Sequence, residues 1–183
     1  MHCLSCGAQL QHTGRIQKCE YCGGVTQLNL RTDVSALSLS ERLTIKANAE
    51  KFIDDARSIS ALVILYLDDE LTDAALNILS RGLSSYPTDA ELHFLQAVAL
   101  LSKDIIKKAK ISDIDLAVKH LSFALKIDKN AFSAECHFVT RKLEEGYFKR
   151  NFIKPSQAFL ELKDEVASCL DDEIEIGRFM VLK

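Results

Sequence analysis

The chain has 183 residues, 48% of them hydrophobic and 27% charged, with a net charge of −3 and an isoelectric point near 6.0. This composition is typical of a folded globular protein and excludes disorder over most of the length. The slight acidity gives no overall attraction to nucleic acid or to anionic membranes. No run of eighteen apolar residues occurs, and no basic segment followed by an apolar run begins the sequence. We therefore expect no membrane span, no secretory signal and a cytoplasmic location.

Four of the six cysteines lie in the first 22 residues as two CxxC pairs with the overall spacing C-x2-C-x12-C-x2-C. A glycine follows each pair, Gly7 and Gly23. Tight turns of this kind aim two thiolates at one point, and two facing turns supply a tetrahedral set of sulfur ligands. Zn²⁺ suits such a site best, although iron uses the same four thiolates. The sequence therefore predicts one structural metal site with no open coordination position, ligated by Cys3, Cys6, Cys19 and Cys22.

Residues 1–30 are expected to form a small β module around this metal. Strand-forming residues occupy positions 8–10, 15–18 and 25–30, and Thr13-Gly14 is a candidate turn. The stretches CLSCGAQL and CEYCG resemble the opening and the closing of zinc-ribbon modules. The resemblance implies a three-stranded zinc ribbon, and a module this small depends on its metal to fold.

Helical periodicity begins near residue 40, after a linker over residues 31–39. Ser38 and Glu41 have the spacing of a capping box, and apolar residues then recur at steps of three and four. We expect residues 40–183 to form one α-helical domain. The fold class predicted for the whole chain is mainly α, with a small N-terminal β zinc ribbon.

Two windows of the helical domain share a pattern of small and apolar residues. The first contains Leu62, Val63, Tyr66, Ala75, Leu79, Gly82 and Pro87. The second contains Ala97, Ala117, Leu121 and Ala124. Over residues 56–130 this pattern resembles tetratricopeptide repeats, in which small residues let paired helices approach closely. The distance from Ala97 to Ala117 is twenty residues, where the tetratricopeptide step is twelve, so about eight residues around SKDIIKKAKIS are inserted or extend a helix.

The end of the chain fits the repeat less well. Residues 131–166 are interpreted as a degenerate third repeat or a capping helix pair. Pro155 is expected in the first turn of a last amphipathic helix that contains Phe159, Leu162, Val166 and Cys169 and caps the domain. Residues 171–183 fit a terminal strand and a frayed tail equally.

The resemblance to tetratricopeptide repeats implies a curved array whose concave face binds a peptide or a partner helix. In that framework the groove-facing residues, which form the predicted partner-binding surface, are Arg57, Ser60, Ile64, Leu67, Asp68, Glu91, Phe94, Val98, Leu101 and Ser102. No phosphate-binding loop, GxSxG motif or GxGxxG motif occurs, so we do not expect an enzyme. The predicted function is a non-enzymatic protein-interaction adaptor with a structural Zn²⁺. The sequence indicates no oligomeric state.

A nucleic-acid-associated regulatory factor is the alternative. Lys103, Lys107, Lys108 and Lys110 make the insert basic, and YFKRNFIK interleaves basic residues with Phe148 and Phe152. The ribbon carries Arg15 and Lys18 against Glu20, a net charge of only +1, which favours the adaptor. We interpret the lysines as solvated and the two phenylalanines as core. The histidines His93, His120 and His137 are dispersed in the sequence, and Cys136 and Cys169 are interpreted as small buried apolar residues.

Overall fold

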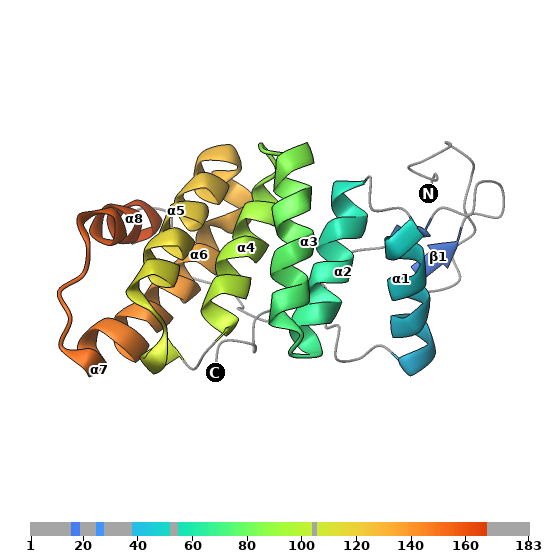
Figure 1. Ribbon diagram of the computed structural model, residues 1–183. Helices are drawn as coiled ribbons and strands as arrows, with labels where there is room; N and C mark the ends of the chain where they lie inside the picture. The colour runs from blue at the N-terminus through green and yellow to red at the C-terminus, as the bar shows by residue number, and fades with distance from the viewer. Residues whose placement is uncertain (1–15, 19–24, 28–37, 52–54, 104–105, 168–183) are drawn as a thin grey trace.

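The computed structural model describes residues 16–18, 25–27, 38–51, 55–103 and 106–167, and it shows a mainly helical chain. The longer helices stand side by side in a row from α1 to α6, and each contacts the next along the sequence (Figure 1). An α-helical domain is therefore confirmed for the body of the chain. The cysteines of the predicted metal site lie outside the described residues.

Two strands precede the helices. They are β1 (Ile16–Lys18) and β2 (Val25–Gln27), and they pair antiparallel with Ile16 opposite Gln27. The rest of the predicted ribbon and the linker up to residue 37 lie outside the described residues.

The helical elements follow in chain order. They are α1 (Leu39–Lys51), α2 (Ala56–Asp68), α3 (Thr72–Ser85), α4 (Ala90–Ser102), the short 3-10 helix η2 (Ile106–Lys108), α5 (Ile111–Ile127), α6 (Lys129–Leu143), the π-helical turn η3 (Glu144–Phe148), α7 (Lys149–Asn151) and α8 (Gln157–Ala167).

An aspartate stands at the N-cap of every second helix of the row, α2, α4 and α6. The carboxylate of Asp55 accepts hydrogen bonds from the backbone amides of Arg57 and Ser58 at the start of α2. Asp89 accepts one from Leu92 at the start of α4, at 2.9 Å, and Asp128 accepts one from Ala131 at the start of α6, at 3.1 Å. Each carboxylate satisfies an amide that the helix itself leaves without a partner and lies at the positive end of the helix dipole.

Close helix packing in α2 to α5 depends on small residues. A Cβ atom added at Gly82 on α3 would lie 3.0 Å from Cγ2 of Ile59 on α2 and 3.4 Å from Cδ1 of Leu92 on α4. Glycine at this position lets α3 approach both neighbours at once. The small residues of the predicted pattern are also fully buried, namely Ala75, Ala97, Ala117 and Ala124.

The segment predicted as an insert lies between α4 and α5 and contains η2. Ile106 and Ala109 point into the core, while Lys107, Lys108 and Lys110 are exposed. Gly146 of η3 packs on Ile106, because a Cβ atom there would lie 3.1 Å from its Cγ2 atom.

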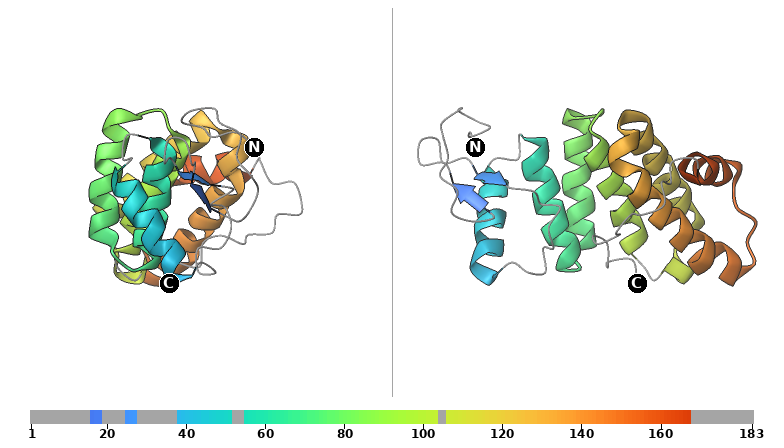
Figure 2. Two further views of the ribbon diagram at one scale, coloured as in Figure 1. Left: turned by 90° about the vertical axis from the view of Figure 1, so that its right-hand side faces the viewer. Right: turned by 180° about the vertical axis from the view of Figure 1, so that it is seen from behind.

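The last helix is present as expected, with Phe159, Leu162 and Val166 buried. It packs on α5 and α6 and runs across the direction of the other helices (Figures 1 and 2). The expected position of Pro155 is wrong. Pro155 lies before the helix, and Ser156 occupies the N-cap, with its Oγ accepting the amide of Phe159 at 3.4 Å. Serine is a better cap than proline because its hydroxyl accepts an amide hydrogen bond.

Candidate interaction surfaces

The predicted metal ligands, Cys3, Cys6, Cys19 and Cys22, lie outside the described residues. The strands β1 and β2 bracket the second CxxC pair in the sequence. Within the described part of the chain, no group of three or more histidine, cysteine or acidic side chains is placed to hold a metal ion. Cys136 is buried as expected, and burial raises the pKa of its thiol.

The predicted groove residues require a correction, because the structure buries half of them. The buried residues are Ser60, Leu67, Phe94, Val98 and Leu101, each less than 5% exposed. The reason is clearest for α4, in which ten of thirteen residues are buried and which packs against α3, α5 and α2. A helix that is apolar around most of its circumference belongs to the core and has no free face. The ring of Phe94 packs on that of Phe132 of α6, with centroids 5.5 Å apart.

The other five predicted groove residues are less buried. Arg57 is exposed, and Ile64, Glu91 and Ser102 are half-buried. The hydroxyl of Ser102 donates to the carbonyl of Val98 at 2.8 Å. Asp68 is half-buried and ion-paired with another helix, so these five residues do not form one apolar surface.

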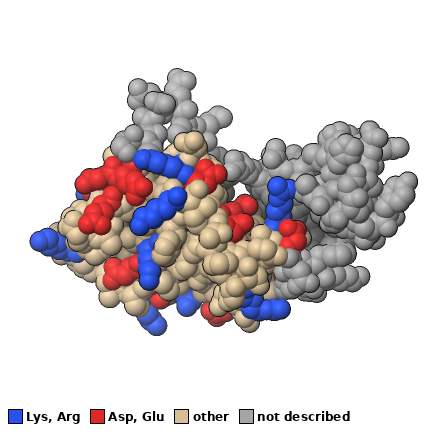
Figure 3. Space-filling view, turned by 90° about the horizontal axis from the view of Figure 1, so that it is seen from above, with Lys and Arg blue, Asp and Glu red and all other residues tan. Residues whose placement is uncertain are grey.

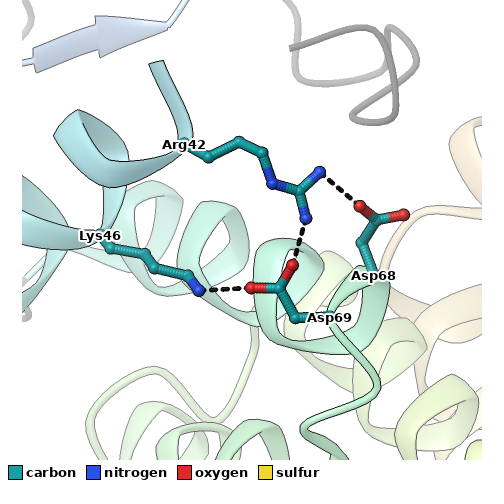
Figure 4. Close-up of polar contacts among 4 residues, drawn as sticks. All are labelled: Arg42, Lys46, Asp68 and Asp69. Atoms are coloured by element: carbon teal, nitrogen blue, oxygen red, sulfur yellow. Dashed lines mark hydrogen bonds and ion pairs between the residues drawn. The ribbon is translucent and has the colours of Figure 1, made fainter. Parts of the chain in front are cut away.

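Asp68 and Asp69 receive two cations from α1 (Figure 4). The guanidinium of Arg42 bridges them, with Nη1 2.5 Å from Oδ2 of Asp68 and Nη2 on Oδ1 of Asp69. Lys46 donates to the other oxygen of Asp69, and its Nζ lies 5.6 Å from the centroid of the Tyr66 ring. The hydrogen bond from Lys46 is the main cause that lowers the pKa of Asp69. Charged groups thus join α1 to α2.

One face of α5 exposes large apolar side chains in a regular row. Leu116, Phe123 and Ile127 are each about 40% exposed, and the half-buried His120 lies between the first two in the sequence. Their spacing of four, three and four residues places all four on one face of the helix. We call these residues the α5 stripe. Two exposed lysines, Lys119 and Lys126, lie on the same helix next to stripe residues. Sequence periodicity missed this face because α5 also carries the buried row that faces the core.

Two histidines that are far apart in the sequence meet between α4 and α5. Nδ1 of His93 lies 2.9 Å from Nδ1 of His120, and Nε2 of His93 lies 3.0 Å from the carbonyl oxygen of Pro87. A carbonyl only accepts, so Nε2 of His93 donates; in the neutral ring its Nδ1 then accepts, and Nδ1 of His120 donates. The two side chains, 27 residues apart in the sequence, are thus hydrogen-bond partners in the fold. Burial, His93 and Lys119 together lower the pKa of His120 to about 4.

The two basic segments of the sequence also meet. Asn151 at the end of α7 donates from Nδ2 to the backbone oxygen of Lys107 in η2, at 3.0 Å. Of the two phenylalanines interpreted as core, Phe148 is buried and that interpretation is confirmed. For Phe152 it is wrong, because this side chain is 96% exposed. Elsewhere, the face seen from above mixes acidic and basic side chains (Figure 3).

Comparison of the chain with protein-family profiles, with curated proteins and with solved structures gives no match. Among the described residues, no helix has the length and apolar character that a membrane crossing requires.

Proposed function

We propose that this protein is a non-enzymatic adaptor whose helical body binds an amphipathic segment of another protein. The observation that carries the proposal is the α5 stripe. A row of large apolar side chains at helical spacing, each about 40% exposed, is an unusual feature of a protein surface and is typical of a binding face. The structure also corrects the surface expected from the sequence, since Phe94 and Val98 lie in the core while α5 presents Leu116 and Phe123.

The helical body is proposed to be a tetratricopeptide-like array. The N-cap aspartates of α2 and α4 are 34 positions apart (89 − 55), which is the length of one such repeat. The helices α2 and α3, and α4 and α5, pack as consecutive pairs, and α2 also contacts α4. Gly82 and Ala124 occupy the close approaches that the repeat pattern assigns to small residues.

The charges beside the stripe indicate the chemistry of the partner. Lys119 and Lys126 are exposed, so a helix laid on the stripe gains from carboxylates beside its apolar anchors. Antiparallel pairing of a second copy of α5, with Leu116 set against Ile127, would bring both Lys119 and the exposed Asp115 near Lys126 of the other copy, so the charges do not specifically favour a second copy. The expected partner segment is therefore acidic and carries apolar residues at spacings of three and four.

A display library of peptides selected on the purified full-length protein tests the proposal. We expect enrichment of amphipathic acidic sequences, which are then synthesised and titrated by fluorescence anisotropy. Replacing Leu116 and Phe123 by glutamine should weaken their binding at least tenfold, because the two anchors lose most of their buried apolar area.

The matched control replaces two exposed leucines outside α5, Leu43 on α1 and Leu71 before α3, by glutamine. Circular dichroism melting checks that both double variants fold. Equal affinity of the selected peptides for the stripe variant and the control, or no enrichment at all, would contradict the proposal.

We also propose that residues 1–30 form a zinc ribbon. The four-cysteine spacing supports this, as does the antiparallel pairing of β1 with β2 on either side of Cys19 and Cys22 in the sequence. Elemental analysis of protein purified without chelator should find about one equivalent of zinc, and Cys19→Ser should lose it. Cys136→Ser is the matched control and should keep the metal. Iron in place of zinc, or full metal content in Cys19→Ser, would refute this assignment.

A further inference from the structure

A second surface lies at the end of the array where η2 meets the turn after α7. The hydrogen bond from Asn151 to Lys107 and the packing of Gly146 on Ile106 hold these segments together. Figures 1 and 2 both show the start of α5 beside α7 at this end. We call this surface the Phe152 patch, and it consists of Lys107, Lys108, Arg150, Phe152 and Lys154.

Phe152 has a backbone conformation that phenylalanine rarely adopts. Its φ of 55° and ψ of 34° lie in the left-handed region, and the next amide, of Ile153, donates to the carbonyl of Phe148 at 3.0 Å. Glycine usually occupies this place at the end of a helix, because a Cβ atom is disfavoured there.

Packing does not explain the phenylalanine either. The side chain is 96% exposed, so the ring contributes almost nothing to the core. The turn therefore holds a large aromatic ring in solvent at a cost to local stability. Strain of this kind is most common where function requires it.

The four charged residues of the Phe152 patch are all cationic. Lys107, Lys108, Arg150 and Lys154 are exposed, and none of them forms an ion pair within the described part of the chain. The neighbouring Lys149 differs, because its Nζ lies 3.5 Å from Glu144. Four cations that form no ion pair with another described residue therefore lie on the two segments of the patch, one of which also presents the ring.

We propose that the Phe152 patch binds single-stranded nucleic acid, with one base stacked on Phe152 and the phosphates following the four cations. Stacking needs an open base face, which a single strand offers and a duplex hides. An anionic membrane fits less well. The exposed apolar side chains at this turn are Phe152 of the patch and the neighbouring Ile153, which is 38% exposed, and together they are a small area for stable insertion. The proposal is independent of peptide binding at the α5 stripe.

Fluorescence anisotropy with labelled oligo(dT) and oligo(U) tests the proposal on the full-length protein between 50 and 200 mM salt. The two oligomers separate DNA from RNA as the preferred strand. If the four cations neutralise four phosphates, the logarithm of the association constant should fall linearly with the logarithm of the salt concentration, with a slope of about −3. Phe152→Gly should weaken binding roughly five- to hundredfold at every salt concentration and leave this slope unchanged.

Two further variants separate charge from folding. Replacing Lys107 and Arg150 by glutamine should reduce the magnitude of the slope by about 1.4. Replacing Lys119 and Lys126, the lysines beside the α5 stripe, should leave oligomer binding unchanged. Phe152→Gly relieves the backbone strain and should melt at or above the wild-type temperature, so its loss of binding cannot come from unfolding.

Three outcomes would overturn the proposal. These are no oligomer binding at 50 mM salt, full binding by Phe152→Gly, or Phe152-dependent binding to vesicles of phosphatidylcholine and phosphatidylserine without oligomer binding. The stripe variant with Leu116→Gln and Phe123→Gln should keep its oligomer affinity, so failure of this proposal and failure of the adaptor proposal are distinguishable.

Discussion

The contact between α1 and α2 and the contact between α4 and α5 are built from different interactions. Between α4 and α5, fully buried apolar residues such as Ala97, Ala117 and Leu121 fill the interface. Of the described side chains of α1, none is buried, and Leu39 and Leu43 are 74% and 57% exposed. The cations of α1 contact Asp68 and Asp69 instead.

The difference indicates how firmly each helix is held. Apolar burial contributes about 25 cal/mol for each Å² and is insensitive to moderate salt. An ion pair near the surface contributes about 0–1 kcal/mol and is screened by salt. We therefore expect α4 and α5 to unfold with the rest of the array, and α1 to separate from it first.

The largest effect should come from the apolar interface. Phe94→Ala removes a ring that is 1% exposed and packs on Phe132, so it should lower the free energy of unfolding by about 3–5 kcal/mol in denaturant titration. Phe152→Ala is the matched control, and we expect a change within about 0.5 kcal/mol because that ring is exposed. Similar losses from both variants would show that the described core is wrong.

Adding volume in the array should have the next largest effect. Ala75 is fully buried on α3, so Ala75→Leu should overpack the contact with α2 and destabilise the protein by about 1–3 kcal/mol. The same substitution at the exposed Ala158 on α8 should be close to neutral. If Ala75→Leu leaves the free energy of unfolding unchanged, α2 and α3 do not approach closely at Ala75, and the repeat assignment loses that support.

A smaller effect is expected at the polar junction. Asp69→Asn removes the carboxylate that Arg42 and Lys46 share, and it should cost at most about 1 kcal/mol. Backbone amide hydrogen exchange should show where Asp69→Asn loosens the protein: we expect faster exchange in α1 and unchanged exchange in α4. Raising the salt concentration to about 1 M should speed exchange in wild-type α1 and have little further effect in the variant.

Asp115→Asn changes an exposed aspartate on α5 in the same way and controls for charge alone. Exchange in α1 that does not respond to salt would mean that the ion pairs contribute nothing to its docking.

A pH dependence is also expected within the α4–α5 contact. The pKa of His120 is about 4 in the folded chain and near 6.5 when the residue is free, so the unfolded state binds the proton first as the pH falls. The contribution of His120 to stability is therefore complete above pH 6.5 and declines between pH 6.5 and 4. Denaturant titration should show a shallower decline over this window for His120→Gln than for wild type. Equal slopes would show that burial and the contact with His93 do not lower the pKa of His120 in the folded chain.

Local patterns predicted much of the helical body. The spacing of Ala75, Leu79 and Gly82 identified the buried face of α3, and the row Phe159, Leu162 and Val166 identified α8. These predictions succeeded because helical periodicity is a property of neighbours in sequence. The N-cap aspartates Asp55 and Asp89 could also have been found, since each directly precedes an apolar-periodic segment.

The sequence predicted less accurately which faces of the helices are exposed to solvent. The sequence assigned Phe94, Val98 and Leu101 to a groove, but α4 is apolar on nearly every side and its pattern contains no polar face to mark a surface. Which side of α5 faces solvent depends on where α4, α6 and α8 pack, and no window of the sequence contains that information.

By itself, the sequence determined the order of the helices, the small residues where they approach, and the four-cysteine pattern that predicts a metal. These are local features, set by periodicity, side-chain size and ligand spacing. Only the tertiary structure placed His93 on His120, joined Arg42 to Asp68 and Asp69, and brought η2 beside Asn151. Such contacts link residues 26 to 44 positions apart, and they form only after burial of the apolar faces has fixed how the helices stack.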